Sequence, residues 1–362
     1  MTGEEYWRDL VAGRRQGVIA WLLSTFLKTI AFPYSVLLRT RERGYASGLL
    51  KSRRLGCPVI SVGNLAVGGT GKTPMTALIA RHLIGQGKRV VVLSRGYGGS
   101  YSGTPRIVSD GQTIFMTAAE CGDEPYLLAR DLPGLMVVVG HNRYRAGKLA
   151  EQELHPECFL LDDGYQHLKL QRDLNILLLD CGNPLSNGWT LPAGALREPI
   201  AALKRADLVV FTRCDGGDNH PDVVPPGIPV LTAGHRISGV VPLDGRDVSS
   251  FSVLYGERVM AFAGIADPGR FFSCLTEAGL DVVGRFDLPD HAVYDERTIN
   301  GIRHIFRNTA ATCLVTTGKD AVKLEQHRKQ LGRIWVAKLE LALAAPILLE
   351  SMVDGLFTTG EG

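Results

Sequence analysis

The sequence lacks the features that would indicate a secreted or repetitive protein. Its seven cysteines are scattered and none forms a Cys-x-x-Cys pair, so no disulfide framework is indicated, and buried, reduced thiols are expected. It shows no internal repeat and no low-complexity tract. A secretory signal peptide is not expected, because Glu4, Glu5 and Asp9 precede the apolar stretch and no small-x-small cleavage site follows it.

Long uncharged hydrophobic runs are also scarce. The most apolar stretch is Val18–Leu38, but Lys28 interrupts it and Pro33 lies inside it. At helical spacing its polar side chains gather on one arc and most of its large apolar side chains on the other. This pattern predicts an amphipathic helix that lies in a membrane interface rather than crossing the bilayer. A core helix with a solvated basic face is the alternative.

Length and charge set the broad organisation. A chain of 362 residues with 45% hydrophobic content can bury a sizeable core and is long enough for two domains. Its net charge of +3 divides unevenly, with +6 in residues 1–54 and −3 in the remainder. A basic N-terminal end on a mildly acidic body indicates that only this end meets an anionic surface.

From residue 58 onward, short apolar runs alternate with helical patterns. Continuous apolar strands between helices predict a mostly parallel sheet covered by helices on both faces. Segment 97–112 is rich in Gly, Ser, Thr and Pro, and we expect it to be irregular. The pattern restarts near residue 235. We therefore expect an α/β fold in three parts: a membrane-surface segment (1–54), a P-loop nucleotide-binding domain (55–236) and a smaller α/β domain (237–362).

The chain is organised around a glycine-rich loop between an apolar strand and a helix, ending in Gly71-Lys72-Thr73. Glycine amides can wrap phosphate oxygens, and the helix start adds a positive dipole end. In such a loop the lysine contacts the β- and γ-phosphates of ATP and the threonine hydroxyl ligates Mg²⁺. Ala66 stands where the general P-loop pattern has glycine. The expected nucleotide-binding residues are Gly68, Gly69, Thr70, Gly71, Lys72 and Thr73.

A P-loop enzyme needs an acidic Mg²⁺ ligand at the end of a neighbouring strand. Asp162 and Asp163 end one apolar run and Asp180 ends another. We favour the pair, because the polar loop Gly164-Tyr165-Gln166-His167 that follows it can face phosphates. Which of Asp162 and Asp163 ligates the metal stays open.

Several polar residues follow other strands at the same predicted edge. Candidate substrate or phosphate contacts are Arg95, Tyr97, Glu124, Arg143, Gln166, His167 and Arg197. Spacing alone favours Asp123 as the N-cap of a helix with Pro125 in its first turn. A single histidine such as His291, in a loop before a helix, would by itself be read as a surface or capping residue.

Taken together, these motifs resemble those of the tetraacyldisaccharide 4′-kinase family, the lipid A 4′-kinases of Gram-negative bacteria. The resemblance covers nearly the whole chain. It rests on residues 62–64, 68–74, 94–97, 122–125, 162–167, 191–194, 196–199, 290–291, 316–317 and 319–324. The family shares Ala66, whereas Gly318 stands where the family commonly has Glu.

The resemblance implies an enzyme that transfers the ATP γ-phosphate to the 4′-hydroxyl of tetraacyldisaccharide 1-phosphate, with Mg²⁺. It implies that Asp123 is the general base, with His291 as its partner and Lys72 at the phosphates, which reverses the capping interpretation. It also implies a glycolipid substrate and a peripheral or monotopic location on the cytoplasmic face of the inner membrane. No nucleic acid and no obligate protein partner are expected.

Two other classes of function remain to be weighed. The first is a membrane-associated P-loop GTPase-type switch with a protein partner, for which Thr317-Gly318-Lys319-Asp320 offers only a poor match to an Asn-Lys-x-Asp element. The second is a structural protein that binds anions without turning over ATP.

Overall fold

The computed structural model describes residues 3–214, 220–243, 245, 248–290, 292–324 and 327–358. His291 therefore lies outside the described residues. The chain divides into two compact units. The first comprises residues 1–72, 143–234 and 343–362, and the second comprises residues 73–142 and 235–342. Segment 73–142 thus belongs to the same unit as most of the C-terminal part, and the division at residues 54 and 236 stays a prediction.

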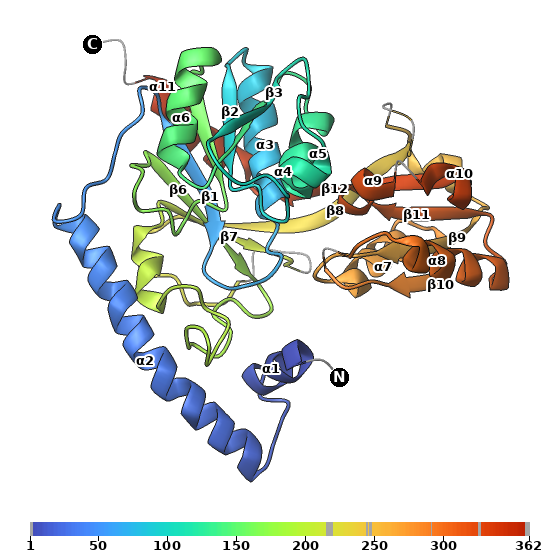
Figure 1. The fold of residues 1–362 in the computed structure, drawn as a ribbon, viewed down its shortest axis with the longest axis horizontal. Helices are drawn as coiled ribbons and strands as arrows, with labels where there is room; N and C mark the ends of the chain where they lie inside the picture. Colours follow the sequence, from blue (N-terminus) through green and yellow to red (C-terminus); the bar gives the residue numbers. More distant parts are fainter. Residues whose placement is uncertain are drawn as a thin grey trace. The chain divides into compact units, whose positions relative to one another are not determined.

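The first unit is built on parallel strands in the order β8-β7-β6-β1-β5 (Figure 1). The strands are β1 (Val59–Asn64), β5 (Cys158–Asp162), β6 (Leu174–Asp180), β7 (Leu208–Thr212) and the first residues of β8 (Val230–Pro242), whose remainder from residue 235 belongs to the second unit. The helices are α1 (Gly3–Val11), α2 (Val18–Ala46), α6 (Arg143–Glu153), the 3₁₀-helix η1 (Ile200–Arg205) and α11 (Pro346–Thr358). Every residue of β1, β5 and β7 is buried, as expected of parallel strands covered on both faces.

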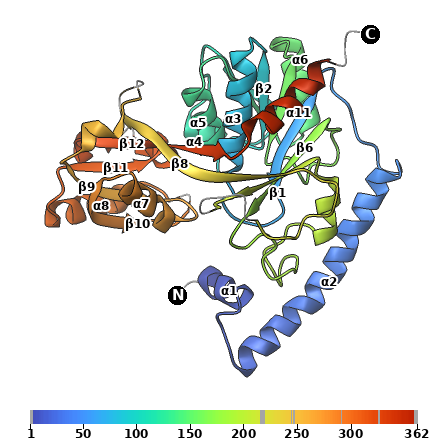
Figure 2. The same ribbon diagram turned by 180° about the vertical axis from the view of Figure 1, so that it is seen from behind.

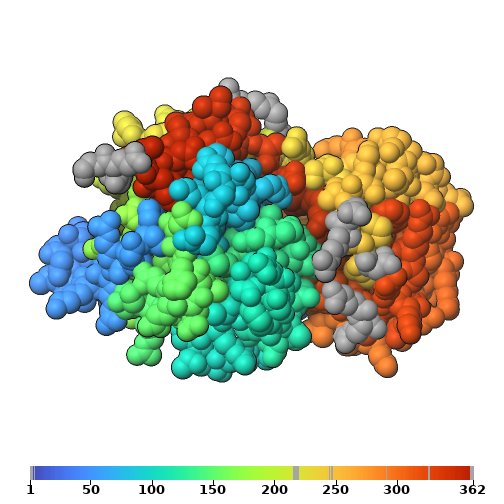
Figure 3. Space-filling view, turned by 90° about the horizontal axis from the view of Figure 1, so that it is seen from above, coloured from blue at the N-terminus to red at the C-terminus, as the bar shows by residue number. Residues whose placement is uncertain are grey.

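The second unit contains two groups of strands, in the orders β2-β4-β3 and β10-β9-β11-β12. Its strands are β2 (Val90–Ser94), β3 (Arg106–Asp110), β4 (Met136–Val139), β9 (Arg258–Ala263), β10 (Asp281–Asp287), β11 (Cys313–Thr317) and β12 (Ile334–Leu343). Its helices are α3 (Lys72–Gly85), α4 (Ala118–Cys121), α5 (Asp123–Asp131), η2 (Phe251–Leu254), α7 (Pro268–Glu277), α8 (Glu296–Asn308), α9 (Gly318–Leu324) and α10 (Arg328–Leu331). In Figure 3 the yellow to orange-red segment of this unit forms one continuous body.

The expected α/β fold with a mostly parallel sheet is confirmed, and three details differ. Segment 97–112 is not wholly irregular, because β3 pairs antiparallel with β4 there. β3 is a partly exposed strand with mixed burial, so it has no continuous apolar run to reveal it. Near residue 235, where the pattern was expected to restart, β8 runs as one strand from Val230 to Pro242. β10 was missed because exposed and only partly buried residues alternate along it, so it has no buried apolar run.

Helix α2 is a continuous helix that runs through Pro33. Figures 1 and 2 both show it alongside the yellow-green loops of the first unit. Its described buried residues are the small Ala20 and Ala31, whereas most of its large apolar side chains are exposed. It is the one helix in the described part of the chain that is long and apolar enough to cross a membrane. The alternative of a buried core helix is therefore wrong.

Glycine at position 63 is required by the close packing of β1 against the turn that follows β5. A Cβ placed on Gly63 would lie 2.6 Å from Cβ of Tyr165 and 2.8 Å from its backbone nitrogen. Tyr165 is itself buried, and its hydroxyl donates to the carbonyl of Ala202 at 2.7 Å. Tyr165 cannot move away from a Cβ at position 63 unless the backbone beside the P-loop shifts.

We expect Gly63→Ala to lower the free energy of unfolding by about 1–3 kcal/mol, the usual cost of overpacking a core. Gly85→Ala is the matched control, because a Cβ at the end of α3 meets no atom within 4 Å. Urea denaturation of both variants measures the difference. Equal stability of the two would contradict the packing argument.

Candidate active site

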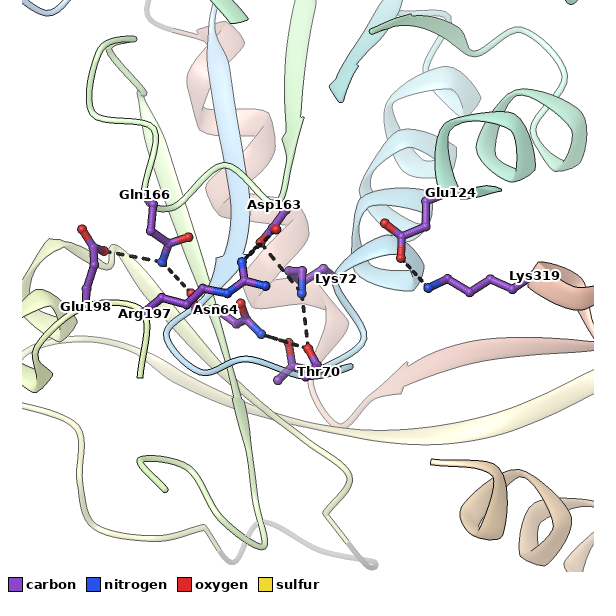
Figure 4. Close-up of polar contacts among 10 residues, drawn as sticks. Asn64, Thr70, Lys72, Glu124, Asp163, Gln166, Arg197, Glu198 and Lys319 are labelled. Atoms are coloured by element: carbon purple, nitrogen blue, oxygen red, sulfur yellow. Dashed lines mark hydrogen bonds and ion pairs between the residues drawn. The ribbon is translucent and has the colours of Figure 1, made fainter. Parts of the chain in front are cut away.

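The loop between β1 and α3 has the conformation of a phosphate-binding loop. Gly68 and Gly71 have φ of 131° and 81°, a region that favours glycine. A Cβ on Gly68 would meet no atom within 4 Å, so this side of the loop is open. The amide of Asn64 braces the loop from within, donating to Oγ1 of Thr70 at 3.0 Å and to the carbonyl of Gly68 at 3.3 Å (Figure 4).

The end of β7 supports the same loop from the other side. Oγ1 of Thr212 donates to the carbonyl of Thr70 at 3.0 Å, and the guanidinium of Arg213 donates to the carbonyl of Gly69. Arg213 also forms an ion pair with Asp180 at 2.8 Å. Asp180, the competing candidate for the metal, is therefore engaged in bracing the loop. Sequence reasoning missed Arg213, whose position directly after an apolar strand was its only signal.

Lys72, Asp163 and Arg197 form the charged centre of this site (Figure 4). One nitrogen of Arg197 donates to both carboxylate oxygens of Asp163 at 2.8 Å. Nζ of Lys72 lies 3.8 Å from Oδ1 of Asp163, and the lysine side chain is only 14% exposed. Burial raises the pKa of the Asp163 carboxyl, but the charges of Lys72 and Arg197 outweigh it and hold this pKa below its ordinary value.

The turn after β5 gives its two aspartates different surroundings. Asp162 pairs in register with Val62 and is buried, whereas Asp163 has φ of 53° and a partly exposed side chain. Backbone strain of this kind in a residue other than glycine is typical of functional sites. The carboxylates here, like the hydroxyl of Thr73 at the start of α3, are hard oxygen donors, which suit Mg²⁺.

The described residues contain no group of three or more His, Cys, Asp or Glu side chains that could hold a metal. The protein would thus supply few ligands itself. Mg²⁺ bound with a nucleotide takes most of its ligands from phosphates and water, so the donor set fits that metal.

The loop that carries Arg197 is joined to the P-loop through the backbone. The amide of Val67 donates to the carbonyl of Ala195 at 2.8 Å, and the amide of Arg197 donates to the carbonyl of Leu65 at 2.6 Å. These bonds place the guanidinium beside Asp163. No local pattern indicated that this loop bonds to the P-loop, since the bonded backbone groups are about 130 residues apart in the chain.

Three further candidates lie near this centre in the first unit. Nε2 of Gln166 donates to the carbonyl of Asn64 at 2.8 Å. Arg143, the first residue of α6, is 4% exposed. Nε2 of His167 is buried and has no hydrogen-bond partner among the described residues. Buried polar atoms are normally satisfied, so this nitrogen is free to accept a hydrogen bond from a bound molecule or water.

The second unit holds the other candidates. Helix α5 begins at Asp123 and its N-cap is Gly122, with φ of 94°, so the capping interpretation of Asp123 is wrong. Oδ2 of Asp123 lies 2.8 Å from Nζ of Lys323. Oε1 of Glu124 lies 2.6 Å from Nζ of Lys319 (Figure 4). Sequence reasoning missed both lysine partners.

Arg95 and Tyr97 follow β2 in the same unit. Nε of Arg95 donates to Nδ1 of His141 at 3.3 Å, and both residues line a small pocket with Glu120. Tyr97 is exposed, and its carbonyl oxygen would lie 2.5 Å from a Cβ on Gly122. That close approach explains why glycine precedes Asp123.

The burial of His167 among positive charges can be tested through the pH dependence of stability. Burial and then the positive charge of Arg143 lower the pKa of His167 to about 4. The unfolded chain binds this proton near pH 6.5 and the folded chain only near pH 4, so protonation favours unfolding between these values. We expect wild type to lose stability relative to His167→Gln as the pH falls from 7 to 4.5. Urea denaturation at pH 7 and pH 4.5 measures the free energy of unfolding of both proteins. If the difference between them is the same at both pH values, the pKa of His167 is not lowered.

Comparisons with known proteins agree with this geometry. The family model described as "LpxK: Tetraacyldisaccharide-1-P 4'-kinase" matches residues 23–357. A tetraacyldisaccharide 4'-kinase of Geobacter metallireducens is 52% identical over 333 residues, which cover 92% of this chain and 98% of that protein. A tetraacyldisaccharide 4'-kinase of Geobacter sulfurreducens is 51% identical over 354 residues, which cover 98% of this chain and 99% of that protein. A crystal structure of LpxK from Aquifex aeolicus in complex with ATP has a TM-score of 0.79 at 35% identity, covering 92% of this chain and 99% of that one. The chain therefore belongs to the tetraacyldisaccharide 4′-kinase family.

Proposed function

We propose that this protein transfers the γ-phosphate of ATP to the 4′-hydroxyl of tetraacyldisaccharide 1-phosphate, a lipid A precursor. The observation that carries the proposal is a braced P-loop with Lys72 beside Asp163 and Arg197, in a chain of this kinase family. The GTPase alternative is wrong, because the relatives are named as kinases and the similar solved structure is a complex with ATP. An anion-binding structural protein is excluded on the same grounds.

At the nucleotide, residues 68–73 and the ammonium of Lys72 hold the phosphates of ATP. We assign Asp162 rather than Asp163 to Mg²⁺, together with the hydroxyl of Thr73. The support is that Asp163 already accepts two bonds from Arg197, while Asp162 stands at the strand end beside β1. Bound Mg²⁺ would neutralise charge on the transferred phosphoryl group.

At the acceptor, we assign Asp123 as the general base and His291 as its partner. Phosphoryl transfer has a loose transition state, so orientation and charge neutralisation carry most of the catalysis. As the sugar oxygen bonds to phosphorus, its proton passes to the Asp123 carboxylate and ADP leaves with the electrons of the broken P–O bond. Substrate or phosphate contacts are assigned to Arg95, Tyr97, Glu124, Arg143, Gln166, His167 and Arg197.

Because the acceptor is a glycolipid, helix α2 would hold the protein at the membrane that contains this substrate. Large apolar side chains of α2 face away from the body of the first unit, which supports peripheral or monotopic attachment to a membrane. The basic flanks of the helix would contact anionic headgroups at the cytoplasmic face of the inner membrane. The surface of the N-terminal segment is visible in blue in Figure 3.

Lys72→Ala tests the nucleotide assignment. It removes one charged phosphate contact without changing the core, so we expect turnover to fall by roughly 10²-fold or more with the fold retained. Labelled ATP with and without a detergent-dispersed disaccharide acceptor measures transfer, and circular dichroism checks the fold. Near-normal transfer by a folded variant would refute the P-loop assignment.

Replacing Trp21, Leu22, Phe26 and Ile30 with serine tests the membrane role of α2. All four side chains are exposed, so the variant should stay folded, float free of vesicles that contain anionic lipid, and show a raised KM for the lipid acceptor. ATP affinity should not change. Raised salt should weaken the binding of wild type, because the basic flanks act through a screened potential.

The matched control for α2 places serine at four exposed apolar positions elsewhere, Val253, Tyr255, Val283 and Ile347. This control should bind vesicles as wild type does. Equal loss of vesicle binding in both variants would show that general surface hydrophobicity, rather than α2, attaches the protein.

A further inference from the structure

Two lysines of one short helix pair with the two acidic residues that begin α5. Lys319 and Lys323 are four residues apart on α9, so they project from the same side of that helix. Lys319 pairs with Glu124 and Lys323 with Asp123, and all of these groups belong to the second unit. Helix α9 thus presents a matched pair of cations to the Asp-Glu dipeptide.

Lys323 makes a second contact besides its ion pair with Asp123. Its Nζ donates to the carbonyl of Ala292 at 3.2 Å while it lies 2.8 Å from Oδ2 of Asp123. The side chains of Lys323 and Asp123 are 18% and 14% exposed, so the pair is mostly shielded from water. Ala292 follows His291 in the chain. One ammonium therefore ties the proposed base to the segment that carries its proposed partner.

The position of α9 is itself fixed by a buried carboxylate. Asp320 is fully buried, and its two oxygens accept from the amide of Gly264 at 3.1 Å each. The hydroxyl of Thr317 donates to the same carboxylate at 2.7 Å. These bonds anchor the start of α9 to the ends of β9 and β11. Lys323, one turn further along, is thus presented from a rigid base.

We propose that Lys323 is a positioning residue that orients the carboxylate of Asp123 for catalysis. The inference rests on the proposed function, since it requires Asp123 to be the general base. An ammonium at 2.8 Å restricts rotation of the carboxylate and favours its ionised form, which is the form that accepts a proton. The sugar proton passes to Asp123.

Steady-state kinetics of five variants test the proposal: Lys323→Met, Lys323→Arg, Asp123→Asn, the double variant Asp123→Asn/Lys323→Met, and Lys338→Met. Methionine keeps the length of the lysine side chain and removes its charge. Lys338 is the matched control, because its ion pair with Asp131, at 2.5 Å and with similar exposure, holds the other end of α5. Thermal unfolding of each variant measures the purely structural cost.

We expect Lys323→Met to lower kcat by roughly 10-fold or more, a part of the 10²–10⁴-fold that a general base contributes. The KM for ATP should stay within about twofold, and Lys323→Arg should recover part of kcat because it restores the cation. The double variant should be no slower than Asp123→Asn, since the two residues act as one unit. Lys338→Met should keep wild-type kcat.

The outcomes separate the two proposals. A fully active Asp123→Asn enzyme would refute Asp123 as the base, and the role of Lys323 would fall with it. An inactive Asp123→Asn enzyme together with wild-type kcat in Lys323→Met would overturn only the positioning role. Losses in Lys323→Met that multiply with those of Asp123→Asn, or that Lys338→Met reproduces, would show that the lysine merely stabilises the fold.

Discussion

Two cations share one carboxylate at the end of β5, and the phosphate site of the first unit depends on that arrangement. Asp163 holds Arg197 directly and lies within ion-pair distance of Lys72. Within this group of three side chains one negative charge faces two positive charges, so together they carry a net positive charge that attracts phosphate oxygens. The left-handed backbone of Asp163 aims its carboxylate at both partners, and the local strain is offset by these contacts.

The loop that presents Arg197 also contacts helix α2. Oγ of Ser35 on α2 lies 2.7 Å from Oγ1 of Thr190, and the ammonium of Lys28 lies 5.5 Å from the ring centre of Trp189. Small and polar side chains on the inner side of α2 allow this close approach. The large apolar side chains are consequently left on the outer side, where a lipid surface can cover them. One loop thus contacts both the phosphate site and the helix proposed to bind the membrane.

Local sequence patterns predicted most strands, the P-loop and the helix after it, because each depends on neighbours within a few residues. Pairings between distant residues could not be predicted in this way. Arg213 meets Gly69, and Lys323 meets Asp123, across about 144 and 200 residues, and no periodic pattern records such contacts. The capping error at Asp123 has a different cause. Sequence spacing located the start of α5 to within one residue. An N-cap is a single position, however, and Gly122 rather than Asp123 occupies that position.

Gly318, at the start of α9, packs against α5, and this contact favours a residue without a side chain. A Cβ there would lie 3.1 Å from Cδ1 of Leu127, one turn into α5 from Asp123, so any larger residue requires that leucine to shift by a few tenths of an ångström. With glycine, α9 approaches α5 without that adjustment, and the two lysines reach the acidic residues at 2.6 and 2.8 Å. The positive dipole end of α5 and the two ammonium groups then act on the same carboxylates. The glycine therefore preserves the spacing on which both ion pairs depend.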